Sequence, residues 1–174
     1  MSLTFGELIE TPVGSISFFA GDTGLQRVAF MPLQRLKSQQ NINESIPSLP
    51  GLQIVGTLLT EINEFLFGIR KSFSVEIDWR ILNGFQREVL LLTVQIPFGE
   101  ITTYGALAKR LGKPSAARAV GAALGNNPMP MVIPCHRVIA ADNQLQGYIG
   151  GMEIKASLLE LEGHEIENGR VVRK

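Results

Sequence analysis

The one cysteine of the chain, Cys135, stands in the sequence PCHR at positions 134–137, with a Val-Ile pair on each side. A cysteine in an apolar run is ordinarily a small buried hydrophobe. A buried strand, however, would not place an imidazole and a guanidinium directly after it, because burying charge without partners is costly. Both groups lower the pKa of a neighbouring thiol. The sequence therefore predicts that Cys135 is a nucleophile whose pKa is lowered by His136 and Arg137.

A cluster of positive charge lies in residues 100–124. The whole chain has 16 basic and 16 acidic residues, but this segment has four basic residues and one acid, a net charge of +3. The basic residues are Lys109, Arg110, Lys113 and Arg118. A basic patch in a neutral chain predicts contact with nucleic acid.

The same segment contains two short helical patterns separated by Gly112-Lys113-Pro114, as in a helix-turn-helix. We expect Thr102 or Thr103 to cap the first helix and Ser115 to cap the second. The second helix is narrow, because it consists largely of small residues: Ala116, Ala117, Ala119, Gly121, Ala122 and Ala123. A narrow helix serves close approach to DNA and tight packing against another helix equally well, so its composition alone leaves both roles open.

Four stretches together resemble the O6-alkylguanine-DNA alkyltransferases, also called methylated-DNA–protein-cysteine methyltransferases. They are GFQREVLLLTVQIPFGEITTYGALAKRLG, AARAVGAALGNNPMPMVIPCHRVI, GYIGG and LLELEGH. The resemblance covers residues 80–165 nearly without gaps and is specific, because PCHRV, ARAVG, NP and EGH occur at the separations typical of the family. The first half resembles the variable N-terminal domain of the family only weakly.

The resemblance implies four catalytic residues. Cys135 corresponds to the alkyl acceptor, whose sulfur attacks the carbon on guanine O6. His136 corresponds to the general base that takes the thiol proton through a water, and Glu162 to the carboxylate that orients the imidazole. Tyr104 corresponds to the residue that donates to the guanine ring and crowds the DNA backbone. Without the resemblance, Glu162 would be interpreted as a solvated helix residue and Tyr104 as a buried aromatic.

The resemblance also implies a DNA-binding surface. Arg118 corresponds to the side chain that replaces the extruded nucleotide in the base stack, and flipping is required because the O6 substituent lies inside the duplex. In the family, the second helix enters the minor groove and bends the duplex, and the resemblance implies the same here. Further DNA-binding residues on this pattern are Thr103, Lys113, Ala117, Ala119 and Gly121.

Five residues correspond to the substrate pocket. Asn127 matches the hinge between the helix-turn-helix and the active-site loop, main-chain groups of Val138 and Ile149 read the guanine edge, Tyr148 lines the pocket and Pro130 lies on its lip. Many relatives have a small hydroxyl residue where this chain has Ile149, which predicts a narrower pocket. Some relatives hold a structural zinc through cysteines in the N-terminal domain. With no cysteine before position 135, we expect no metal and no cofactor.

The expected function is therefore the irreversible, single-turnover transfer of an alkyl group from O6-alkylguanine, and from O4-alkylthymine, in duplex DNA to Cys135. Two other classes of protein are alternatives. A non-catalytic lesion-binding module on this scaffold has its acceptor cysteine replaced, whereas Cys135 is present. A Cys-His hydrolase or thiol peptidase would leave ARAVG and NNP without a role.

We expect an α+β protein of two domains. Residues 1–80 form a ribonuclease H-like domain, with an antiparallel meander over residues 3–30, a loop over 31–50, a helix over 51–67 that stops at Gly68, and a strand over 73–79.

Residues 81–174 form a catalytic and DNA-binding domain of winged-helix type. Asn83 caps its first helix, whose apolar face is Phe85, Val89, Leu92 and Ile96. A later helix spans about residues 152–162 and is closed by Gly163, and Asn168-Gly169 forms a hairpin turn.

Composition limits the remaining possibilities. The balanced charge gives no global field toward DNA or membranes, and the chain has neither a signal-peptide pattern nor an apolar stretch of about 20 residues. A single cysteine allows no internal disulfide. We expect a cytoplasmic monomer, nucleoid-associated in a prokaryote, that binds no membrane; its cooperativity on DNA is left open.

Overall fold

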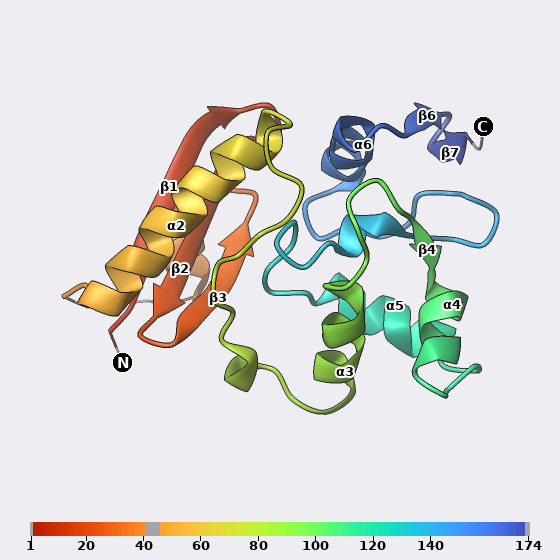
Figure 1. Ribbon diagram of the computed structural model, residues 1–174, viewed down its shortest axis with the longest axis horizontal. Helices are drawn as coiled ribbons and strands as arrows, with labels where there is room; N and C mark the ends of the chain where they lie inside the picture. The colour runs from red at the N-terminus through yellow and green to blue at the C-terminus, as the bar shows by residue number, and fades with distance from the viewer. Residues whose placement is uncertain (1, 41–45, 173–174) are drawn as a thin grey trace. The chain divides into compact units, whose positions relative to one another are not determined.

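The computed structural model describes residues 2–40 and 46–172. The chain forms two compact units, residues 1–81 and residues 82–174. Within the described ranges it has a mixed α/β fold with a three-stranded antiparallel sheet, two short two-stranded pairs and six α-helices (Figure 1). None of the helices in these ranges is long and apolar enough to span a membrane.

The sheet of the first unit is the expected meander. Strands β1 (Thr4–Thr11), β2 (Gly14–Gly21) and β3 (Gly24–Ala29) pair antiparallel in the order β1-β2-β3. Nearly all of β2 is buried, because side chains on both of its faces are covered. Phe18 and Phe19 point to opposite faces, as successive strand residues must, so the sheet needs a helix on each side.

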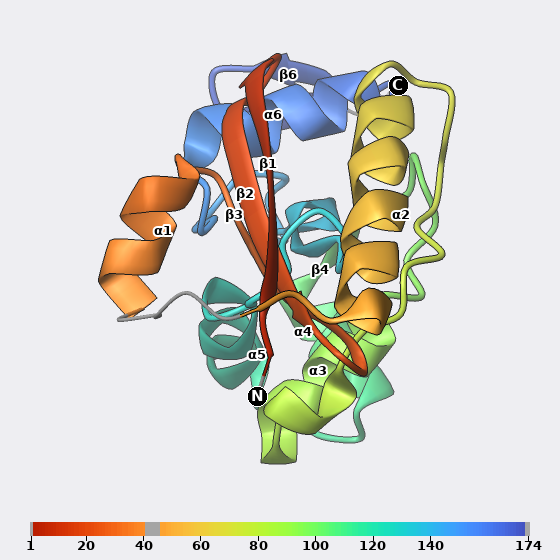
Figure 2. The ribbon, with the colours of Figure 1, turned by 90° about the vertical axis from the view of Figure 1, so that its left-hand side faces the viewer.

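Two helices cover these faces (Figure 2). Helix α2 (Leu49–Leu66) begins two residues before the expected start, where the Ser48 hydroxyl accepts from Gly51 N at 3.1 Å. It ends at the predicted place, and Gly68 has the positive φ of 72° typical of a helix C-terminus.

Helix α1 (Leu33–Gln40) corrects the expectation of a loop over residues 31–50. Its one fully buried residue, Leu36, packs against Phe19 and Ala29 of the sheet. One apolar anchor in a polar stretch gives no visible period, so the contact with the sheet, rather than the sequence pattern, decides the helix. Residues 41–45 of the expected loop lie outside the described residues.

The expected strand over residues 73–79 is wrong. The segment makes a single parallel bridge, Leu25 to Ile77, and then turns into the short 3-10 helix η1 (Trp79–Ile81). The reason is the buried carboxylate of Glu61 on α2, which accepts the backbone N–H groups of Ser74 and Val75 that a strand would use in its ladder.

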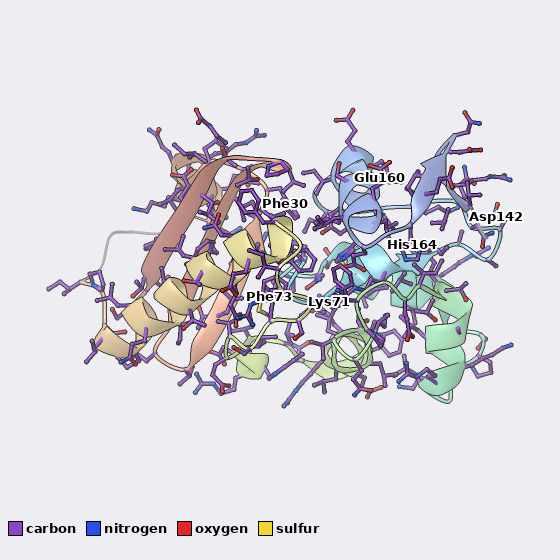
Figure 3. The ribbon with its side chains drawn as sticks, turned by 45° about the horizontal axis from the view of Figure 1, so that its top comes forward. Phe30, Lys71, Phe73, Asp142, Glu160 and His164 are labelled. Carbon is purple, nitrogen blue, oxygen red and sulfur yellow. The ribbon has the colours of Figure 1, made fainter. Side chains whose placement is uncertain are left out.

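Phe73, labelled in Figure 3, adds an aromatic contact to the same segment. Its ring centroid lies 5.2 Å from that of Phe65 on α2. The segment is therefore held to the helix by side chains rather than by strand pairing.

The second unit begins with three helices: α3 (Gly84–Thr93), α4 (Tyr104–Arg110) and α5 (Ala117–Gly125). A short parallel pair joins β4 (Thr102–Thr103) to β5 (Val138–Ile139). This pair brings the start of α4 beside the segment that follows Cys135, so it connects the helix-turn-helix to the segment that contains Cys135.

The end of the second unit follows the prediction. Helix α6 (Met152–Leu161) is closed by Gly163 at φ 91°, and a hairpin joins β6 (Glu165–Glu167) to β7 (Arg170–Val172). Asn168 and Gly169 at its turn both have positive φ, 50° and 73°, as a two-residue hairpin loop requires.

Of the three expected helix caps, only the one at Thr103 forms its side-chain hydrogen bond. Thr103 caps α4 by accepting from Ala106 N at 3.1 Å, as predicted. Ser115 does not cap α5, because the chain turns one residue later and Ala116 takes the cap position. Asn83 precedes α3 but makes no side-chain cap bond, and Ile96 lies beyond the end of that helix although it is buried.

Candidate active site

Cys135, the predicted nucleophile, lies in the short 3-10 helix η2 (Cys135–Arg137), which is buried in the second unit. Cys135 is 5% exposed. The amide of Asn127 donates both to Cys135 Sγ, at 3.2 Å, and to the carbonyl of Ile133, at 2.9 Å. Its oxygen accepts from Met129 N at 3.0 Å. The loop before Cys135 is thus folded around one amide side chain, which also holds the sulfur.

The thiol pKa corrects the prediction made from its sequence neighbours. Burial raises the pKa of Cys135 to about 11, although the bond from Asn127 and the charge of Lys155 act in the opposite direction. Successive residues of a 3-10 helix diverge by a third of a turn, so His136 and Arg137 leave η2 in other directions than the sulfur. A thiol in this site stays protonated at neutral pH until a base removes its proton.

Glu162 meets both residues that follow the nucleophile. At the end of α6, its Oε1 lies 2.9 Å from His136 Nε2, and its carboxylate accepts from Arg137 Nε and Nη2 at 2.8–3.0 Å. Gly99 N donates to Oε2 at 3.1 Å. Burial alone would raise the pKa of the Glu162 carboxyl, but the bonds from His136 and Arg137 outweigh it and lower the pKa to about 2. The carboxylate is therefore ionised, with Arg137 as its counterion.

The proton on His136 follows from this arrangement. Burial lowers the pKa of the imidazole, so the ring is neutral at pH 7. Because an ionised carboxylate only accepts hydrogen bonds, we assign the proton to Nε2. Nδ1 is then the acceptor nitrogen; it is buried and has no hydrogen-bond partner among the described residues. The ring thus has the orientation and tautomer of a general base.

The sequence analysis missed the contacts of two charged residues, Arg137 and Lys155. Arg137 pairs with Glu162 instead of the thiol, and Lys155 on α6 is fully buried, with its Nζ bonded to carbonyls of Val138 and Gln146. The helical spacing held a signal for Lys155, since the buried Leu158 and Leu159 lie three and four residues after it.

The helix-turn-helix presents Arg118 and Ala119 to solvent, with Ala117 and Gly121 partly exposed. A cleft of about 370 Å³ opens beside α5. It is lined by Tyr104, Ala117, Arg118, Gly121, Gly125, Gln146 and Gly147.

Other predicted DNA contacts have partners within the chain. The Thr103 hydroxyl caps α4, and Lys113 forms an exposed ion pair with Glu88 at 2.7 Å. The Tyr104 hydroxyl donates to Gln146 O at 3.0 Å. Of the predicted surface, Arg118 is the exposed cation that lines the cleft.

The residues that line this cleft do not include the five predicted pocket residues. The Tyr148 ring stands edge-on to His136, with centroids 6.4 Å apart. Ile149 is 43% exposed, whereas Pro130, expected on the lip, is buried. The main-chain groups of Val138, expected to read guanine, are bonded to Cys135 O and to Lys155.

Comparison with known proteins gives a consistent result. Residues 84–164 match the family model described as the 6-O-methylguanine DNA methyltransferase DNA binding domain. The chain is also 36% identical to the methylated-DNA–protein-cysteine methyltransferase of Methanosarcina acetivorans, over 90% of this chain and 96% of that protein. The chain belongs to the methylated-DNA–protein-cysteine methyltransferase family.

Solved structures of methyltransferases from this family have the same fold. The crystal structure of Mycobacterium tuberculosis O6-methylguanine methyltransferase has a TM-score of 0.76 at 33% identity, over 92% of each chain. That of Mycobacterium tuberculosis OGT in complex with DNA has a TM-score of 0.76 at 32% identity, over 91% of each chain. Membership in the methyltransferase family argues against the alternative that the chain is a Cys-His hydrolase or thiol peptidase.

Proposed function

We propose that this chain repairs O6-alkylguanine in duplex DNA by taking the alkyl group onto Cys135. The bond between Cys135 Sγ and the alkyl carbon forms as the bond from that carbon to guanine O6 breaks, and guanine leaves with the electron pair. The observation that carries the proposal is the buried thiol held by Asn127 beside the His136–Glu162 pair, in a chain of the methyltransferase family. O4-alkylthymine presents the same kind of carbon and is proposed as a second substrate.

The general base in this proposal is His136. Its Nδ1 takes the thiol proton through an intervening water, while Nε2 keeps its bond to Glu162. The imidazolium that forms is stabilised by the carboxylate, which is already ionised. Such a relay suits this site because burial disfavours a free thiolate, so that charge on sulfur appears only as the carbon is attacked.

The DNA contacts proposed for this chain follow from α5. Arg118 is exposed next to a cleft of about 370 Å³, which supports the proposal that its guanidinium enters the base stack when the damaged nucleotide turns out. The small residues of α5 allow a close approach through the minor groove. Ile149 lies in the segment beyond Gln146 and Gly147, and we propose that it narrows the entrance for bulky adducts.

The finer structural expectations also belong to this proposal. They are a ribonuclease H-like first unit, a winged-helix second unit, and a cytoplasmic monomer that needs no metal or cofactor.

Mass spectrometry of the intact protein tests the function. After incubation with a duplex carrying O6-methylguanine, we expect one methyl group per molecule, located on Cys135 by peptide mapping. A thioether has no group that water can expel, and the chain has no second thiol, so each molecule reacts once. The matched control, Cys135→Ser, should bind the duplex without gaining mass. Repeated turnover, or methyl transfer to another residue, would refute the proposal.

A further inference from the structure

Lys155 is a buried cation that the proposed relay does not use. Its side chain projects from α6 into the interior of the second unit and is fully buried. The ammonium donates to Val138 O at 2.8 Å and to Gln146 O at 2.7 Å. Burying an ammonium is expensive, and two neutral carbonyls compensate that cost less than a carboxylate would. A Lys in this place therefore calls for an explanation beyond packing.

The two acceptors belong to the walls around the nucleophile. Val138 opens β5, directly after η2, and Gln146 lines the cleft beside α5. The hydroxyl of Tyr104 donates to the same carbonyl of Gln146, at 3.0 Å, and Lys155 Nζ lies 6.0 Å from the centroid of the Tyr104 ring. One ammonium thus ties together β5, the cleft wall and the start of α4.

The charge of Lys155 also reaches the reacting sulfur. It lowers the pKa of Cys135 and of His136, while Cys135 in turn favours the charged form of Lys155. Burial lowers the pKa of Lys155 to about 8. The ammonium is therefore mostly protonated at pH 7 and is the cation that acts on negative charge at Cys135.

We propose that Lys155 is a positioning residue for alkyl transfer, which fixes Gln146 and the Tyr104 hydroxyl at the cleft and supports the negative charge that develops on Cys135 Sγ. This assignment rests on the proposed function, because it gives Lys155 a part in that reaction. A lysine that merely completes the core would hold the same two carbonyls but would leave the chemistry of the sulfur unchanged.

Two variants and two reactions separate these roles. Lys155→Met keeps the length of the side chain but removes its charge and its donors, whereas Lys155→Arg keeps both. Glu160→Gln, on the exposed side of the same helix, is the control for a change of charge on α6 (Figure 3). One reaction is transfer from free O6-benzylguanine, followed by mass spectrometry. The other is alkylation of Cys135 by iodoacetamide between pH 6 and 10, which requires no repair activity.

For Lys155→Met we expect both reactions to slow by about tenfold at pH 7, the effect of one unit in the pKa of the thiol. In the iodoacetamide series the difference from wild type should narrow above pH of about 8, where wild-type Lys155 loses its proton. Lys155→Arg should stay close to wild type at pH 7 and lack the change of slope near pH 8, because Arg stays charged. Glu160→Gln should match wild type throughout.

The outcomes are distinct from those that test the proposed function. If Lys155→Met keeps its circular dichroism spectrum and reacts like wild type with both reagents, Lys155 is a core residue and the inference is wrong. If Lys155→Met does not fold, the wild-type protein provides the test. A rate of Cys135 alkylation by iodoacetamide that shows no change of slope near pH 8 would then overturn the inference. If wild type fails to react with O6-methylguanine while the iodoacetamide differences appear, the proposed function is wrong but the action of Lys155 on the sulfur is supported.

Discussion

Glu162 Oε1 lies 2.9 Å from His136 Nε2, across 26 positions of sequence, and both side chains are buried. The same carboxylate accepts from Arg137 and from Gly99 N, so every direction in which it accepts is occupied by a donor. This arrangement fixes the imidazole so that Nδ1 is its free acceptor. If His136 is the general base, as proposed, the fold orients it before any substrate binds.

Glu162→Gln tests whether this pair serves the chemistry. The amide has no charge to stabilise the imidazolium, so transfer from free O6-benzylguanine should slow by about 10²-fold, the contribution of a general base. Affinity for undamaged duplex DNA, measured by fluorescence anisotropy, should stay at the wild-type value. Transfer at the wild-type rate would show that Glu162 has no part in activating the thiol.

The same substitution should destabilise the second unit. Glu162→Gln leaves Arg137, which is 5% exposed, without its counterion. Breaking a buried ion pair costs about 3 kcal/mol or more. Both tyrosines lie in the second unit. Urea unfolding followed by tyrosine circular dichroism should therefore shift to lower urea, whereas Glu160→Gln, which removes an exposed carboxylate from α6, serves as the control and should not shift.

Acid should remove this stabilisation in a defined range of pH. Because the folded state lowers the pKa of Glu162 from 4.5 to about 2, its contribution is fully present above pH 4.5 and is lost as pH falls toward 2. The difference in unfolding free energy between wild type and Glu162→Gln should therefore be constant above pH 5 and shrink below pH 4. A difference that stays constant down to pH 2 would contradict the ion pair.

The lowered pKa of Cys135 that was predicted from its neighbours His136 and Arg137 is wrong. The thiol is buried, and Arg137 pairs with Glu162, which is distant in sequence. The helix-turn-helix pattern predicted α4 and α5 because it is a local signal, and the PCHR sequence is the local signal for Cys135 as the nucleophile, which stays a prediction. The pairing of Arg137 with Glu162 depends on a fold that brings positions 25 apart together, and the sequence carries no local sign of it. Likewise α1 exists through the contact of Leu36 with the sheet, and the segment after Phe73 is shaped by Glu61.

The raised thiol pKa predicts how Cys135 behaves without substrate. With a pKa of about 11, Cys135 should react with iodoacetamide at pH 7 far more slowly than free cysteine, whose pKa is about 8.5. Asn127→Leu removes the donor to Sγ and leaves Met129 N without its side-chain acceptor, so the rate at pH 7 should fall further and stability should drop by about 1 to 3 kcal/mol. A wild-type rate equal to that of free cysteine would contradict the buried, protonated thiol.

Arg118→Ala separates opening of the duplex from transfer of the alkyl group. Arg118 is exposed on α5, beside the cleft, and has no part in the hydrogen bonds around Cys135, so the variant should react with free O6-benzylguanine at the wild-type rate. In duplex DNA the flipped base leaves a gap in the stack, and unstacking costs a few kcal/mol. Without a side chain to fill that gap, repair of O6-methylguanine in a duplex should slow by about tenfold or more.

The measurement is a pair of single-turnover rates, one on free O6-benzylguanine and one on the duplex. Arg110→Ala, at an exposed residue of α4, is the control for loss of one positive charge. Equal losses on the free base and on the duplex would show that Arg118 supports the cleft itself. If Arg110→Ala slows duplex repair as much as Arg118→Ala does, Arg118 contributes only its positive charge. General attraction to DNA phosphates does not distinguish between basic residues.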